Sequence, residues 1–285
     1  VGMAVDGPLR TSTIPALVPH HRLVNALSLN GIAINGTRLL LPAGVGVALG
    51  VTSPGWAYVA LSLIFISNQF INAKLNLPSV QGRERGRSMF AELWEGLRFA
   101  GSNADVLSVI TVAVGLQGIG FASRALIPVF AAEQLGAGPG AYGVLLSADG
   151  AGAVLFGLVL ASVGLGKRRG LTMVLFSAVN AGGIIILGWT SWIVIAALIS
   201  MGIGGTSTVF RSASNSLLLG STPSHMRGRI MSINGLNPGI APISIAIAGG
   251  IAEATNVSIA MTVIGGSSLL LNLLATFFHR RLLHL

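Results

Sequence analysis

Six ionisable residues lie inside long apolar stretches of this sequence: Asp6, Arg10, Arg38, Arg124, Asp149 and Arg211. Charged side chains in such surroundings form ion pairs, move protons or bind charged groups, because an isolated charge in an apolar medium is costly. Cysteine chemistry is excluded because the chain has no cysteine, and its five histidines lie in loops or at the tail. An intramembrane enzyme is therefore the weaker interpretation, since it would need a cluster of such groups at one depth.

The composition tells us which kind of element carries these charges. Hydrophobic residues make up 52% of the 285 residues, charged residues make up 9%, and the mean hydropathy is +0.80. Soluble domains carry about 25% charged residues. The composition therefore predicts an all-α, polytopic membrane protein, in which the 39 glycines allow close packing of helices.

Apolar runs of helical length divide the chain into spans. About 20 residues, at about 1.5 Å per residue, cross a hydrocarbon core of about 30 Å. We expect eight full spans and part of a ninth: 1–19 in part, then 24–50, 55–73, 105–131, 140–164, 170–189, 192–219, 229–252 and 257–278.

The one long polar segment, Lys74–Ser102, holds five basic and three acidic residues and must lie in water. It divides the chain into a first part (1–73), a connecting loop (74–102) and a second part (103–285). Its apolar residues recur at helical spacing (Met89, Phe90, Leu93, Trp94 and Leu97). They predict an amphipathic helix on the membrane surface, with a plain connecting helix as the alternative.

Basic residues are confined to alternate loops. Thirteen Lys and Arg fall in one set of loops and at the C-terminal tail, and none falls in the loops 52–56, 131–140, 188–191 and 253–256. By the positive-inside rule the basic loops and the C-terminus are cytoplasmic. This distribution also accounts for the net charge of +9 without nucleic acid as a partner.

Five segments carry a family resemblance: PLRTSTIPALVP (8–19), NGTRLLLPAGVG (35–46), ELWEGLRF (92–99), GAYGVLLSADGAGAVLFG (140–157) and SNSLLLGSTPSHMRGRIMS (214–232). Together they resemble the major facilitator superfamily and, within it, the bacterial drug and siderophore exporters related to the enterobactin exporter. The resemblance implies a fold of twelve helices, of which this chain would hold helices four to twelve, as an N-terminally truncated fragment. It places the six charges in helices four, five, seven, eight and ten, and none in the outer helices six, nine and twelve.

The same resemblance implies roles for two groups of residues. Pro42, Gly44 and Gly46 lie where such exporters carry a Gly- and Pro-rich antiporter motif. Two basic loops would gate the cytoplasmic side through charge contacts between helix ends, or would only anchor the topology: Lys167, Arg168 and Arg169 in one, and Arg227, Gly228 and Arg229 in the other.

Depth in the membrane suggests one specific pair. Arg124 and Asp149 lie about eight and nine residues from the outer ends of consecutive spans, which is roughly 12–14 Å deep for both. We hypothesise that Asp149 is a titrating carboxylate coupled to proton movement, with Arg124 as its partner; the alternative is a static ion pair. Asp6 and Arg10 are spaced for a local pair on one helix face, whereas Arg38 and Arg211 have no obvious acidic partner and would meet other helices or an anionic substrate group.

These observations favour a secondary active transporter that exports a small hydrophobic or amphiphilic compound in exchange for protons. An importer of another solute and a non-transporting scaffold are the alternatives. No Walker-type loop is present, so an ATP-driven pump is not expected. We expect a monomer in a bacterial cytoplasmic membrane, without cofactor or metal, whose partners are the lipid bilayer, the substrate and the proton gradient.

Overall fold

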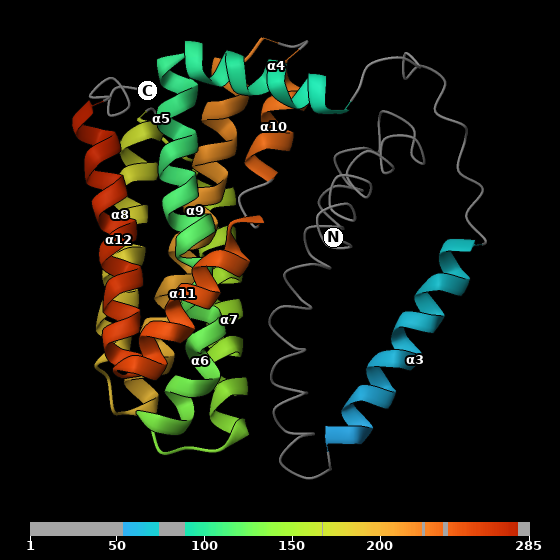
Figure 1. Ribbon diagram of the computed structural model, residues 1–285, viewed down its shortest axis with the longest axis vertical. Helices are drawn as coiled ribbons and strands as arrows, with labels where there is room; N and C mark the ends of the chain where they lie inside the picture. Colours follow the sequence, from blue (N-terminus) through green and yellow to red (C-terminus); the bar gives the residue numbers. More distant parts are fainter. Residues whose placement is uncertain (1–53, 74–88, 167, 224–225, 236–238, 279–285) are drawn as a thin grey trace.

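The computed structural model describes residues 54–73, 89–166, 168–223, 226–235 and 239–278, and every regular element among them is helical. The elements, in chain order, are α3 (Pro54–Ala73), α4 (Met89–Ser102), α5 (Ala104–Ala113), the π-helix η2 (Val114–Ile119), α6 (Phe121–Glu133), α7 (Pro139–Val163), α8 (Arg169–Gly188), α9 (Ile193–Ser221), α10 (Arg227–Gly235), α11 (Ala241–Ala254) and α12 (Val257–Phe278). Figure 1 shows α5 to α12 as one elongated bundle, with α4 lying across one end and α3 standing apart.

Five helical segments in the described part are long and apolar enough to cross a membrane. Their bounds agree with five predicted spans: Ala104–Glu133, Gly140–Val163, Arg169–Gly188, Ile193–Ser221 and Val257–Phe278. The polytopic membrane fold is thus confirmed. The expected span 55–73 is a helix, α3, although it is not one of these five, and the expected spans 1–19 and 24–50 lie outside the described residues.

One predicted span differs from the structure. The expected helix 229–252 is two shorter helices, α10 and α11, and only α11 is apolar enough to count as a short membrane helix. The sequence between them includes Pro238, and Pro242 lies in the first turn of α11. Proline has no N–H for the helical ladder and disfavours helical backbone in the residue before it. A prediction from hydropathy alone joins the two helices because it does not register this interruption.

The span Ala104–Glu133 is continuous but not uniform. Asn103 caps its start, because the side-chain oxygen accepts the N–H groups of Asp105 and Val106, each at 3.1 Å. In its middle the N–H of Gly120 donates to the carbonyl of Gly115 at 3.1 Å, the wider spacing of a π-helix. Such π-segments are rare and often occur at functional sites. This one directly precedes α6, the helix that carries Arg124.

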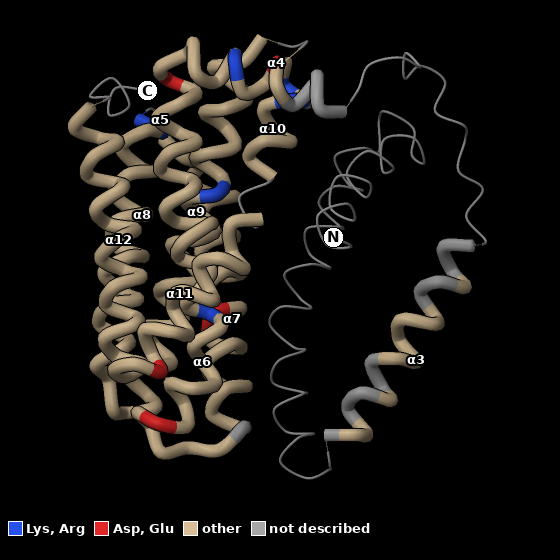
Figure 2. The backbone as a smooth tube through the Cα atoms, in the orientation of Figure 1, with Lys and Arg blue, Asp and Glu red and all other residues tan. Residues whose placement is uncertain are grey.

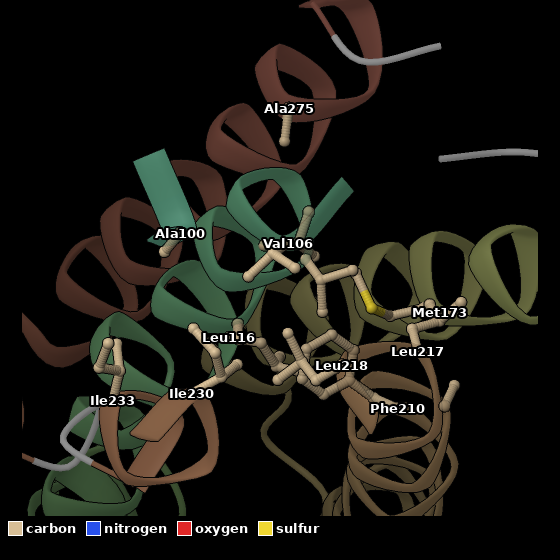
Figure 3. Packing of buried hydrophobic residues seen from close by; sticks show 14 residues of the cluster. Ala100, Val106, Leu116, Met173, Phe210, Leu217, Leu218, Ile230, Ile233 and Ala275 are labelled. Carbon is tan, nitrogen blue, oxygen red and sulfur yellow. The ribbon is translucent and has the colours of Figure 1, made fainter. Parts of the chain in front are cut away.

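Two groups of buried apolar residues hold the bundle together. Figure 3 shows the group at the α4 end, where side chains of α5, α8, α9 and α10 meet, among them Val106, Met173, Phe210 and Ile230. The second group, which includes Phe130 and Met261, joins α6, α7, α8, α9, α11 and α12. The outside of the bundle stays apolar as well, as expected of a surface that faces lipid.

Most of the charged residues lie at the two ends of the bundle. Figure 2 shows only a few of them near its middle. The tryptophans are also placed toward the ends: Trp189 and Trp192 flank the α8–α9 connection, and Trp94 lies on α4; all three are exposed. This is the pattern of a protein whose aromatic residues mark the two membrane–water interfaces.

Candidate functional site

The structure brings Arg124 and Asp149 into direct contact across α6 and α7. Arg124 donates from Nη2 to both carboxylate oxygens of Asp149, at 3.2 Å to Oδ1 and 3.1 Å to Oδ2. The side chains are 34% and 17% exposed, so the pair is partly buried and still open to solvent or to a ligand. The expected juxtaposition of these two residues is confirmed.

The two helices run in opposite directions, which explains the contact. The connection between them is short, so Glu133 at the end of α6 and Pro139 at the start of α7 lie at the same end of the bundle (Figure 1). Arg124 and Asp149 are nine and ten residues away from these two helix ends, respectively. Equal depth on neighbouring antiparallel helices follows from the constant rise of about 1.5 Å per residue.

A glycine-mediated crossing of α7 and α9 lies directly behind Asp149. A Cβ atom added to Gly204 of α9 would overlap the backbone carbonyl oxygen of Asp149, and one added to Gly152 of α7 would overlap that of Met201. Both glycines are buried. The backbones of the two helices therefore touch at the level of the carboxylate. From the sequence we expected close packing by glycines in general, but not which glycines would meet.

Arg211 lies on α9, seven residues beyond Gly204, with an exposed side chain. It has an interaction partner in the structure. Its expected contact with other helices or with an anionic substrate group stays a prediction. The remaining candidates lie outside the described residues: Asp6, Arg10, Arg38, Pro42, Gly44, Gly46 and Lys167.

The basic residues at the α4 end join different helices. Arg229 of α10 donates from Nη1 to Oε1 of Glu95 of α4 at 2.6 Å. Gly96, the next residue on α4, allows close approach, since a Cβ there would lie 2.8 Å from Cδ1 of Ile233. Arg169 of α8 donates to the hydroxyl of Ser216 of α9 at 2.8 Å.

Contacts within the loops are also made at this end. Arg227 donates from Nε to the carbonyl of Thr222 at 3.2 Å, which fixes the turn between α9 and α10. Arg168 is exposed at the start of α8, and Gly228 has nothing within 4 Å of an added Cβ. The sequence indicated the basic loops, whereas Glu95 as the partner of Arg229 was missed, because the two residues are 134 positions apart.

A shallow groove lies elsewhere, between α8 and α9. It has a volume of about 370 Å³ and is lined by apolar residues and glycines, among them Gly183, Gly202 and Ile203. It contains no ionisable group, so it is separate in chemistry from the Arg124–Asp149 pair. Among the described residues, no three His, Cys, Asp or Glu side chains are placed to hold a metal ion.

Comparison with known families decides what kind of protein has this arrangement. The model of the transmembrane secretion effector family, a branch of the major facilitator superfamily, matches residues 1–284. The chain belongs to this family. The superfamily resemblance found in the sequence is therefore confirmed, and membership indicates a membrane transporter rather than an enzyme. No match was found among curated proteins.

Family membership gives the charged pair its setting. In a multi-pass transporter the helices surround a pathway for a solute, and ionisable residues at membrane depth face that pathway or one another. In this chain Arg124 and Asp149 face one another, and their partial exposure also leaves them accessible from a pathway.

Proposed function

We propose that this secretion effector is a proton-coupled exporter of small hydrophobic or amphiphilic compounds, drugs or siderophores, and that it belongs to the branch related to the enterobactin exporter. The observation that carries the proposal is the partly exposed Arg124–Asp149 ion pair within the membrane. A carboxylate in this position changes its net charge by taking up a proton. An ion pair that can be broken in this way is a suitable device for coupling proton movement to a change of shape.

The proton follows one route in this scheme. In the outward-open state the carboxylate of Asp149 accepts a proton from the outer solution and becomes neutral, so its attraction to Arg124 falls. The protein then opens inward, the proton leaves to the cytoplasm, and the pair re-forms as substrate binds. One proton enters for each such cycle, and the substrate leaves by the reverse change of access. Alternating access then needs no ATP.

Charge contacts at the α4 end serve as the cytoplasmic gate in this proposal. The Glu95–Arg229 pair connects α4 with α10, and the Arg169–Ser216 bond connects α8 with α9. When helices at this end move apart, these contacts break, and they re-form on closure. The transporter would work as a monomer in a bacterial cytoplasmic membrane, with the α4 end and the C-terminus in the cytoplasm.

Transport in proteoliposomes tests the proposal. The purified protein is reconstituted, a pH gradient is imposed, and movement of a lipophilic cationic dye is followed by fluorescence. We expect gradient-dependent dye movement that falls to the level of protein-free liposomes in Asp149→Asn, because the amide cannot take up the proton. Glu253→Gln, at an exposed carboxylate near the end of α11, is the matched control and should transport normally.

Each outcome bears on a different part of the proposal. Dye movement that is the same in Asp149→Asn would remove this carboxylate from coupling and leave a static ion pair. Dye movement in the opposite direction, down the imposed gradient together with protons, would indicate an importer. No movement of any dye or of an anionic siderophore would favour a protein of this fold that does not transport.

A further inference from the structure

We infer that the crossing of α7 and α9 at Gly152 and Gly204 positions the carboxylate of Asp149 against Arg124, and that Gly204 is a positioning residue for proton coupling. The inference rests on the proposed function for its consequence in transport, but not for its geometry. The geometric observation is that Asp149 takes part in two contacts at once. Its side chain meets α6 through Arg124, and its backbone carbonyl lies against Gly204 of α9.

The distance between α7 and α9 is tightly constrained at the contact between Asp149 and Gly204. A Cβ at Gly204 would overlap a backbone atom rather than the end of a side chain that could turn aside. Non-bonded heavy atoms keep about 3.5 Å apart, so even one methyl group would force the two helices apart by roughly 1 Å or more. The same holds on the other side of the crossing, where an added Cβ on Gly152 would overlap the carbonyl oxygen of Met201.

A movement of this size away from α6 would bring the pair to the limit of contact. The shorter nitrogen–oxygen distance is 3.1 Å, and ion pairs are counted up to about 4 Å. A shift of about 1 Å at the Cα of Asp149 in that direction would therefore carry the carboxylate to this limit. Aspartate has a single methylene between Cα and the carboxyl group, so its side chain has little length with which to follow.

Contact of backbone with backbone is specific to this level of the two helices, because the neighbouring Gly205 approaches α7 only through the side-chain ring of Phe156. Two residues earlier on α9, Gly202 has nothing within 4 Å of an added Cβ. Further along α7, Gly157 meets only Cγ2 of Thr208, at 3.8 Å. Glycine at 204 is therefore required by the contact with Asp149, whereas glycine at 202 is not required by any contact with α7.

Apart from Asp149 itself, the ionisable residues on α6, α7 and α9 are Arg124, Glu133, Tyr142 and Arg211. Of these, only Arg124 is in ion-pair contact with the carboxylate. The position of α7 relative to α6 is therefore the variable that decides how strongly Asp149 is held. In the proposed cycle, this position sets the coupling of proton uptake to transport.

Cross-linking tests the geometry without any assay of transport. The chain has no cysteine, so Arg124→Cys with Asp149→Cys creates one reactive pair across α6 and α7. A short bifunctional maleimide should join the pair efficiently, and adding Gly204→Ala should lower the yield several-fold. Gly202→Ala, the same substitution two residues away, should leave the yield unchanged. Equal yields with Gly204→Ala and Gly202→Ala would overturn the inference.

A second variant, on the other helix, serves as the control for effects on folding. Gly152→Ala disturbs the same crossing from α7 and should lower the yield in the same way. Folding of each variant is measured by size-exclusion chromatography in detergent, where a folded variant elutes as a single symmetric peak. If both variants fail to fold while Gly202→Ala folds, the crossing serves folding alone and the positioning role is wrong.

Transport by the same variants, with Arg124 and Asp149 restored, separates this inference from the proposed function. Gly204→Ala should flatten the dependence of dye export on the pH gradient, whereas Gly202→Ala should leave it unchanged. The same dependence in the two variants would contradict the positioning role. Absence of gradient-driven transport in the unmodified protein, with the expected cross-linking result, would reject proton-coupled export and keep the assigned geometry.

Discussion

Arg124 and Asp149 stabilise one another in surroundings where neither charge is fully hydrated. With side chains 34% and 17% exposed, the pair is neither a surface salt bridge nor a fully buried one. The net contribution of such a pair is small, whereas the removal of one partner leaves the other charge poorly solvated. Stability measurements can therefore detect the pairing independently of transport.

A double-mutant cycle measures this coupling. We expect Arg124→Gln and Asp149→Asn each to lower the free energy of unfolding, and the double variant to lose less than the sum, with a coupling energy of about 1 kcal/mol. Unfolding in mixed detergent micelles, followed by tryptophan fluorescence, gives the values. Glu133→Gln, at an exposed carboxylate on α6, should show no coupling to Arg124→Gln. Additive effects of Arg124→Gln and Asp149→Asn would mean that the contact contributes nothing to stability.

At the scale of elements, the packing of α4 on α10 attaches α4 to the end of the bundle. Gly96 makes this possible, because its side faces Ile233 and Arg229, while Gly101 at the far end of α4 has open space around it. The Glu95–Arg229 pair lies beside this contact and is half-exposed on the glutamate side. Packing at Gly96 should therefore matter more than the charge pair.

Matched substitutions on one helix test the role of α4. Gly96→Leu should lower the free energy of unfolding by about 1–3 kcal/mol, because the added side chain overpacks the contact with Ile233. Gly101→Leu should stay within about 0.5 kcal/mol of the unmodified protein. Thermal unfolding in detergent, read from tryptophan fluorescence, compares the two variants. Equal losses would show that α4 does not rest on α10 through Gly96.

On the scale of the whole molecule, the described loops that carry Lys or Arg lie at one end of the bundle, and the described loops of the bundle without them lie at the other (Figures 1 and 2). From the positive-inside rule we predict that the end with α4 is cytoplasmic. Conservative serine-to-cysteine changes can test this, because the chain has no other cysteine. Ser102 at the end of α4 and Ser191 between α8 and α9 are both exposed.

We expect a membrane-impermeant maleimide to label Ser191→Cys in intact cells, and to label Ser102→Cys only after the membrane is permeabilised. Both variants should be labelled fully in detergent, which controls for accessibility. The reverse pattern would invert the topology and place the proposed gate on the outer side.

The sequence by itself determined the membrane class, the bounds of five spans and the pairing of Arg124 with Asp149. These follow from local rules: hydropathy and length define a span, and a constant rise places residues at equal depth on neighbouring antiparallel helices. The division into 1–73, 74–102 and 103–285 and the roles of the candidate residues stay predictions.

Only the tertiary structure decided which partners meet across long separations. Gly204 against the backbone of Asp149 and Glu95 against Arg229 depend on the rotation and crossing of helices, which no local pattern encodes. The break between α10 and α11 belongs to the same class, because a proline can either kink a helix or end it, and packing against neighbouring helices decides which.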